Sequence, residues 1–326
     1  MRLLDHSVVL VGGMPGSGTR SVMELFHKLG LPAFGDLDWD SAIGCCSMVP
    51  AVLRSCINAA APPTLWYDTN TSTCTPQAIG MRLEAAFRKY HSQRLNSTAT
   101  AFGAKEPEFF LYLPWLLRIF GAGLHYVHVV RDGRDVALGR SAVWTAALSR
   151  AAGVRSLPGR KESDPLALLS IWAWVNTQIG SNAATRLGPR FLQLHVEDLL
   201  PAARRARTAR VHGPERSEIT ASLERFLASA GLPTADGVVA AALEHVQGAN
   251  LGSLNSPQGG KALGEGKVGF GDGKSGYGKW RQQAERFAGA DLAALQAMGY
   301  SAHANASQDD RGRTIHVSPH HALPTQ

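Results

Sequence analysis

The sequence predicts an α/β protein with three layers, in which helices cover both faces of a central, mostly parallel β-sheet. Short runs of β-branched and aromatic residues alternate with longer amphipathic segments, the order expected of strands and helices in such folds. Ser7–Val11 and Leu124–Val130 contain no Asp, Glu, Lys or Arg, as expected of strands buried on both faces. Glycine-rich sequence and then a helical pattern follow the first of these strands, which marks the start of a β-α unit.

The first half of the chain predicts three helices, the one after the glycine-rich segment included, and one further strand. Val22, Leu25, Phe26 and Leu29 have helical spacing, and Gly30 ends that helix. The other segments are a helix at Ala78–Tyr90, a strand at Ala101–Lys105 and a helix at Phe109–Phe120, with a kink or restart at Pro114.

The second half predicts one more strand, Phe191–Val196, and several helices. These helices are Gly133–Ala147, Leu166–Ala184, Ser217–Ala230, Gly237–Val246, Trp280–Phe287 and Asp291–Met298. Ala249–Gly278 contains ten glycines and little apolar sequence, so a long loop is expected there. Residues 1–302 are expected to form a single domain, and residues 303–326 a disordered tail.

Composition favours a protein that binds an anionic small molecule. The net charge is +7 for 326 residues, which suits an anionic cofactor or an acidic substrate. Nucleic acid is not expected as a partner, because no dense Lys/Arg stripe with interleaved aromatic residues is present. The sequence has no window of about 18 apolar residues, so no membrane span is expected.

The glycine-rich segment after the first strand predicts a phosphate-binding loop, and hence a P-loop type of fold. Glycines at positions 12, 13, 16 and 18 let backbone N–H groups approach phosphate oxygens, and the following helix adds its N-terminal donors. The residues expected to bind the ligand here are Pro15, Gly16, Ser17, Gly18, Thr19, Arg20 and Ser21.

The loop departs from the sequence that ATPases and GTPases use. In the pattern G-x-x-x-x-G-K-[ST] counted from Gly13, the lysine position holds Thr19 and the magnesium-binding position holds Arg20. Both groups needed for Mg·ATP chemistry are absent, which favours a loop that works without a metal.

Six segments, in order between residues 7 and 302, resemble the sulfotransferases that use 3′-phosphoadenosine 5′-phosphosulfate (PAPS). They are Val11–Arg20, Gly103–Pro114, His128–Leu138, Leu194–Leu199, Leu223–Pro233 and Gly278–Tyr300. The resemblance is closer to the glycan- and protein-modifying Golgi branch than to the small-molecule cytosolic branch. It implies transfer of a sulfuryl group from PAPS, without a metal, to a hydroxyl or amine acceptor in a carbohydrate or protein.

The resemblance also implies roles for residues outside the loop. Arg131 and Ser141 would bind the 3′-phosphate, and Lys274 and Trp280 would belong to a segment that covers the nucleotide. Lys105 would contact the transferred sulfuryl group. From the residues themselves, we expect Asp132 and Asp135 to hold Arg131 and Arg134 in place.

Two positions depart from the family. Many members carry Lys or Arg where Gly16 stands, so the catalytic charge would come from Arg20, Lys105 or a residue of the glycine-rich loop. Many also carry Ser where Gly139 stands, so either Ser141 binds the 3′-phosphate from a shifted position or that contact is lost.

The resemblance places the general base among three carboxylates. Pro107 stands where the small-molecule branch has its His. Asp36 and Asp38 rank slightly above Glu106, because the glycan and protein branches have a catalytic Glu after the first helix.

Other function classes remain open from sequence. They are a different P-loop transferase, such as a small-molecule kinase, and a non-catalytic nucleotide-binding relative. The chain as written predicts a cytoplasmic protein. Four cysteines within residues 45–74 and three Asn-x-Ser/Thr sites leave a Golgi lumenal location open, with an N-terminal anchor outside this sequence.

Overall fold

The fold is built on one parallel β-sheet. The computed structural model describes residues 7–31, 81, 101–138, 164–200, 215–232, 234–235, 237–244, 280, 286–287 and 293–301. Within these residues the strands are β1 (Ser7–Gly13), β2 (Ala101–Lys105), β3 (Leu124–Val130) and β4 (Phe191–His195). Their order is β2-β1-β3-β4 and every neighbouring pair is parallel, which confirms the predicted fold class.

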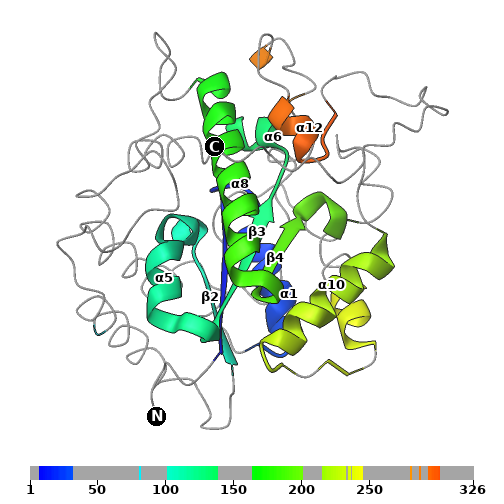
Figure 1. The fold of residues 1–326 in the computed structure, drawn as a ribbon. Coiled ribbons are helices and arrows are strands. Elements are labelled where there is room, and N and C mark those ends of the chain that lie inside the picture. Colours follow the sequence, from blue (N-terminus) through cyan, green and yellow to red (C-terminus); the bar gives the residue numbers. More distant parts are fainter. Residues whose placement is uncertain are drawn as a thin grey trace, which may run out of the picture.

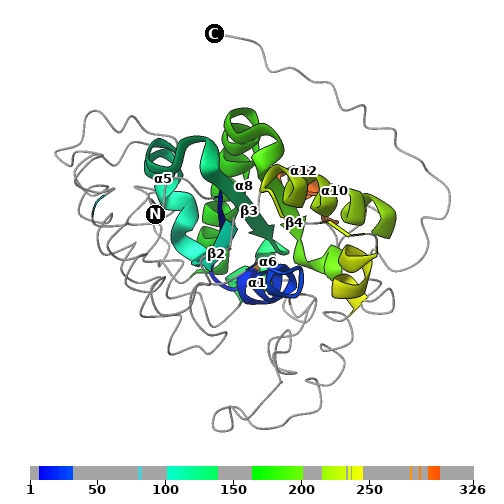
Figure 2. The ribbon, with the colours of Figure 1, turned by 90° about the horizontal axis from the view of Figure 1, so that it is seen from below.

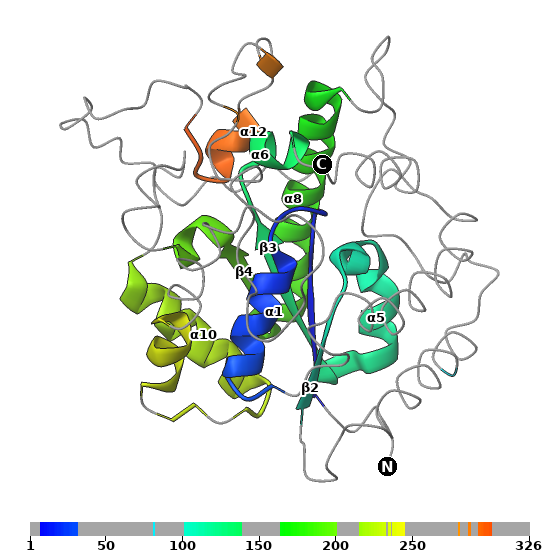
Figure 3. The same ribbon diagram turned by 180° about the vertical axis from the view of Figure 1, so that it is seen from behind.

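Helices cover both faces of this sheet (Figures 1, 2 and 3). The helices α5 (Leu113–Phe120) and α8 (Pro165–Leu187) lie on the face seen in Figure 1. The helices α1 (Thr19–Lys28) and α10 (Arg216–Ser229) lie on the opposite face, which Figure 3 shows. Successive side chains of a strand point to opposite faces of the sheet. Val8 and Leu10 therefore pack in the apolar cluster with α5 and α8, and Val9 and Val11 pack in the cluster with α1 and α10.

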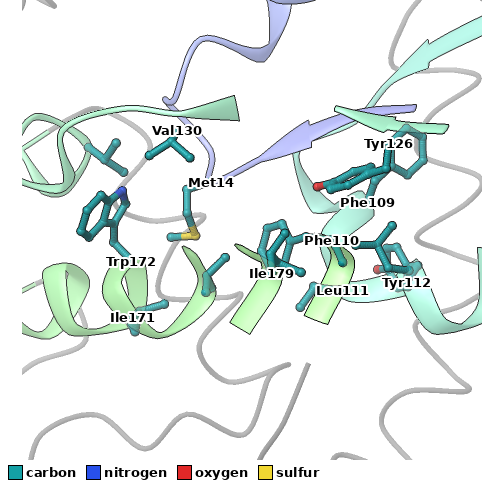
Figure 4. Close-up of a cluster of buried hydrophobic side chains, with 14 of the residues drawn as sticks. Met14, Phe109, Phe110, Leu111, Tyr112, Tyr126, Val130, Ile171, Trp172 and Ile179 are labelled. Atoms are coloured by element: carbon teal, nitrogen blue, oxygen red, sulfur yellow. The ribbon is translucent and has the colours of Figure 1, made fainter. Parts of the chain in front are cut away.

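The core between the sheet and the helices α5 and α8 contains most of the fully buried aromatic side chains among the described residues. Figure 4 shows Trp172 of α8 beside Met14 and Val130, close to the carboxyl ends of β1 and β3. Trp172 is fully buried. The predicted ligand edge of the sheet therefore rests on a rigid apolar layer.

Element boundaries agree with the sequence prediction at several places and correct it at others. β2 has the predicted bounds, whereas β1 continues to Gly13, so the first two glycines belong to the strand. The single helix predicted at Phe109–Phe120 is instead a 3₁₀ helix, η3 (Pro107–Tyr112), followed by α5. Pro114 lies in the first turn of α5, where its missing N–H is not needed, so it marks a helix start and not a kink.

The remaining elements are short. They are η4 (Gly121–Gly123), α6 (Gly133–Ala137), η5 (Gly188–Arg190), η6 (Val196–Leu199), α12 (Ala293–Ala297) and a helix at 238–244. The predicted strand Phe191–Val196 thus ends one residue early, because Val196 starts η6. In the segment predicted as a helix at Trp280–Phe287, the described residues 280, 286 and 287 are 3₁₀-helical.

Several predictions concern residues that the structure does not describe. They are most of the helix Ala78–Tyr90, the end of the helix at Gly133–Ala147, the glycine-rich loop Ala249–Gly278 and the tail 303–326. Within the described part of the chain, no helix combines the length and hydropathy needed to span a membrane.

Candidate functional site

The carboxyl ends of the parallel strands bring the described site residues to one edge of the sheet. Register pairs Val11 with Lys105, Gly13 with Val129, and Val130 with His195. Lys105 therefore ends β2 on one side of the loop that follows β1. Arg131 follows β3 on the other side. Ligands of open parallel sheets bind at this edge.

The loop after β1 turns tightly into α1. The Ser17 N–H donates to the Met14 carbonyl at 2.9 Å, and Gly16 and Gly18 have positive φ angles of 91° and 95°. A side chain at either glycine would strain the backbone. Gly18 is the N-cap of α1, and no acidic residue lies in the first turn, so the positive end of the helix dipole is not neutralised by the helix itself.

Ser17 provides a buried hydroxyl inside this loop. Its side chain is 1% exposed, and its Oγ has no hydrogen-bond partner among the residues that the structure describes. Pro15, Thr19 and Ser21 are buried as well, Arg20 is half-buried and Gly16 is exposed. The loop therefore offers a ligand mainly its backbone at Gly16 and Gly18 and the dipole of α1, which is what an anion requires.

Arg131 lies directly against this loop. Its Nη1 donates to the Gly16 carbonyl at 3.3 Å, and its Nη2 lies 3.6 Å from Asp135 Oδ2. The side chain is 12% exposed. Residues 115 positions apart in sequence thus place a guanidinium beside a loop that is suited to phosphate.

Arg134 has a different environment from Arg131. It is 1% exposed and forms a two-point ion pair with Asp132, through Nε to Oδ1 at 3.0 Å and Nη2 to Oδ2 at 2.9 Å. The Trp280 ring packs over the guanidinium, 3.4 Å from the ring centroid to Cζ. The expected pairing is confirmed, with Asp135 beside Arg131 and Asp132 beside Arg134. The buried Arg134 thus stabilises the segment that joins β3 to α6.

Lys105 and Glu106 stand at the end of β2. Both side chains are half-buried, and the Glu106 N–H donates to the Val11 carbonyl at 3.1 Å, which ties this end to β1. Burial raises the pKa of Glu106 to about 7, against the opposing effect of the Lys105 charge. A carboxyl with such a pKa can accept a proton near neutral pH.

Sequence reasoning assigned no role to Glu197, Trp172 or Tyr300. Glu197 is fully buried, and its Oε1 accepts the Asp132 N–H at 2.8 Å. Trp172 Nε1 donates to the Arg131 carbonyl at 2.9 Å. A local sequence signal exists for two of the three, because Glu197 and Tyr300 lie in segments similar to family motifs, Leu194–Leu199 and Gly278–Tyr300.

The remaining predicted site residues, Asp36, Asp38, Ser141 and Lys274, lie outside the described residues. Among those that are described, no group of three or more His, Cys, Asp or Glu side chains has an arrangement that would hold a metal ion.

Comparisons with solved structures include two distant likenesses, one to a sulfotransferase and one to retinol dehydratase. No protein-family model matches the chain, and no curated protein does either. A sulfotransferase from Mycobacterium avium is 12% identical with a TM-score of 0.39, covering 80% of this chain and 71% of that chain. Retinol dehydratase, solved with retinol and PAP, is 15% identical with a TM-score of 0.38, covering 90% of this chain and 83% of that chain. At this distance neither match assigns a function.

Proposed function

We propose that the chain is a PAPS-dependent sulfotransferase that transfers a sulfuryl group to a hydroxyl or amine of a carbohydrate or protein. The observation that carries the proposal is the contact of Arg131 with the Gly16 carbonyl. It joins a guanidinium to a phosphate loop that lacks the Walker lysine and the magnesium-binding hydroxyl. Such a site suits a nucleotide with two separate anionic groups, bound without a metal.

Each described residue then has a role set by its place on the sheet edge. The backbone of residues 15–21 and the Ser17 hydroxyl would hold the 5′-phosphosulfate, because this loop leads into the N-terminus of α1. Arg131, together with Ser141, would bind the 3′-phosphate. Lys105, at the opposite side of the loop, would stabilise the charge on the sulfuryl group in transfer.

PAPS would supply the sulfuryl group, and the protein would align it with the acceptor and accept the acceptor's proton. Glu106 is suited to that proton because burial raises its pKa to about 7 and it stands next to Lys105. Asp36 and Asp38 remain alternative bases from the sequence. Lys274 and Trp280 would belong to the segment that covers the bound nucleotide.

A non-catalytic nucleotide-binding protein is the second candidate, and Gly16 favours it. The resembling family often has Lys or Arg at this position, whereas here φ is 91°, a conformation that suits glycine. Both the sulfotransferase and the non-catalytic protein would bind the same nucleotide, but only the sulfotransferase would consume PAPS. PAPS consumption with a panel of carbohydrate and peptide acceptors separates them.

The choice of nucleotide can be tested by ligand-induced thermal stabilisation. Adenosine 3′,5′-bisphosphate (PAP) is expected to raise the melting temperature, because a ligand that binds only the folded state stabilises it. ATP with magnesium is expected to have a smaller effect. Greater stabilisation by Mg·ATP, or magnesium-dependent ATP turnover, would contradict the proposal and favour a kinase.

Arg131→Ala is expected to weaken PAP binding by about 1.5 to 3 kcal/mol, the usual value of a hydrogen bond to a charged group. Titration calorimetry measures the loss. Arg225→Ala is the matched control, since Arg225 is exposed on α10 and donates to Ser222 of the same helix. Equal affinity of Arg131→Ala and the parent for PAP would remove Arg131 from the site.

A further inference from the structure

One peptide unit at the end of β3 is held by buried side chains at both of its polar atoms. The Arg131 carbonyl accepts from Trp172 Nε1 at 2.9 Å, and the Asp132 N–H donates to Glu197 Oε1 at 2.8 Å. These two atoms belong to the same planar group. The orientation of the peptide plane is therefore fixed from α8 on one side and from η6 on the other.

Orientation of this plane governs where the Arg131 side chain points. The plane sets ψ of Arg131 and φ of Asp132, and with the strand before it this fixes the direction of the Arg131 Cα–Cβ bond. A long side chain loses considerable rotamer freedom when it is ordered, so a fixed starting direction favours one guanidinium position. The observed position places Nη1 at the Gly16 carbonyl.

Glu197 is itself held by a chain of oriented hydrogen bonds. The Tyr300 hydroxyl donates to Glu197 Oε2 at 2.9 Å, so in its 3.1 Å contact with His195 Nδ1 this hydroxyl accepts. The Nε2 atom of His195 then accepts from Gln193 Nε2 at 3.2 Å. Both Glu197 oxygens have donors, which fixes the carboxyl and prevents its rotation.

Trp172 is fixed by packing. A Cβ at position 133 would lie 2.5 Å from its indole ring, so glycine at 133 is what allows the ring to approach the turn. The Tyr300 ring lies edge-on to the Trp172 ring, with centroids 6.1 Å apart. Tyr300 therefore contacts both residues that hold the peptide, Glu197 through its hydroxyl and Trp172 through its ring.

Burying the Glu197 carboxyl costs free energy, which indicates that this side chain does more than fill space in the core. Burial raises the pKa of Glu197 to about 7, with Asp132 adding to the rise and the Asp132 N–H and Arg131 opposing it. An apolar side chain of similar size avoids this cost but cannot accept the Asp132 N–H.

We propose that Glu197 and Trp172 are positioning residues, which together orient the Arg131–Asp132 peptide so that the Arg131 guanidinium meets the 3′-phosphate of the nucleotide. This inference rests on the proposed function. Neither residue is proposed to touch the nucleotide, so each acts through Arg131.

The test compares PAP with 5′-AMP, which lacks the 3′-phosphate. Glu197→Leu and Trp172→Phe each remove one hydrogen bond to the peptide, and each is expected to lower PAP affinity by about tenfold with less than about threefold loss for 5′-AMP. Glu197→Gln keeps an acceptor for the Asp132 N–H and is expected to bind PAP within about threefold of the parent. Calorimetry at a temperature where every variant is folded measures both affinities.

Two comparisons separate positioning from loss of stability. In an Arg131→Ala background, Glu197→Leu is expected to cause no further change in the ratio of PAP to 5′-AMP affinity, since residues acting through one contact are not additive. His125→Phe, at the amino end of β3, is the control for a buried substitution and should leave the ratio unchanged. Equal losses for both nucleotides, or an undiminished Glu197 effect without Arg131, would overturn the proposal.

Hydrogen exchange provides a measurement that needs no nucleotide. The Asp132 amide is expected to exchange slowly in the parent and in Glu197→Gln, and faster in Glu197→Leu, while the β3 amides keep their protection. Unchanged exchange at Asp132 in Glu197→Leu would overturn the positioning role. If the parent binds no PAP but the Asp132 amide exchanges as expected in all three proteins, the proposed nucleotide is wrong. The role of Glu197 in orienting the Arg131–Asp132 peptide is then still supported.

Discussion

The difference in unfolding free energy between Glu197→Gln and the parent is expected to change with pH. As the pH rises from 4 to 8, it should shift by about 3 kcal/mol in favour of Glu197→Gln. The parent holds Glu197 fully buried with a pKa of about 7, compared with 4.5 for an ordinary Glu. Between these two values the folded state keeps a proton that the unfolded chain has lost. Stability from this group is therefore present below pH 4.5 and is lost as the pH rises through 7. The amide of Gln carries no such proton and keeps its neutral form throughout.

Comparison with the parent at each pH isolates this effect from other buried groups. Glu106, with its pKa raised to about 7, has the same sign, whereas burial lowers the pKa of His128 to about 4, so His128 adds stability as the pH rises from 4 to 6.5. Both contributions occur in parent and variant and cancel in the difference. Urea denaturation from pH 4 to pH 8 measures it. A difference that stays constant over this range would show that Glu197 titrates normally.

The parts of the fold that the sequence predicted well depend on local patterns. The bounds of β2 and the position of the glycine-rich loop between β1 and α1 follow from strand runs, glycines and a helix start, each of which is visible in a short stretch of sequence. Arg131 directly follows a strand, and parallel strands bring their carboxyl ends together, so its place at this edge of the sheet could be expected, whereas its role in binding stays a prediction that the resemblance implies. Of the two alternatives for Pro114, a kink or a restart, the structure shows the restart, because the 3₁₀ helix η3 ends before α5 begins and Pro114 lies in the first turn of α5.

The residues that orient Arg131 could not be predicted in this way. Trp172 is 41 residues from the carbonyl it binds, and Tyr300 is 103 residues from Glu197. Tertiary packing alone makes these contacts. In sequence, Trp172 has the pattern of an ordinary core residue of α8, and Glu197 that of a polar residue after a strand.

Lys105→Ala is expected to lower the rate of sulfuryl transfer by about 10² to 10³, the usual cost of losing one preorganised group that stabilises transition-state charge. Lys105 ends β2 beside Val11, one strand away from the phosphate loop, and Gly16 in that loop has no side chain to supply a charge. The proposed site therefore depends on Lys105 more than a site with a cation at position 16 would. PAP affinity is expected to change by less than about threefold, because PAP lacks the transferred group.

Turnover of PAPS with water, carbohydrate or peptide acceptors measures this effect, and Lys28→Ala is the matched control. Lys28 is an exposed lysine in the last turn of α1, at the opposite end of that helix from the loop. The pH profile gives a second, independent readout. The Lys105 charge opposes the rise in the pKa of Glu106, so its removal should move that pKa upward. If Glu106 is the base, the residual activity of Lys105→Ala will therefore need a higher pH than the parent's. A lower rate with an unchanged pH profile would keep Lys105 in the mechanism and move the base to Asp36 or Asp38.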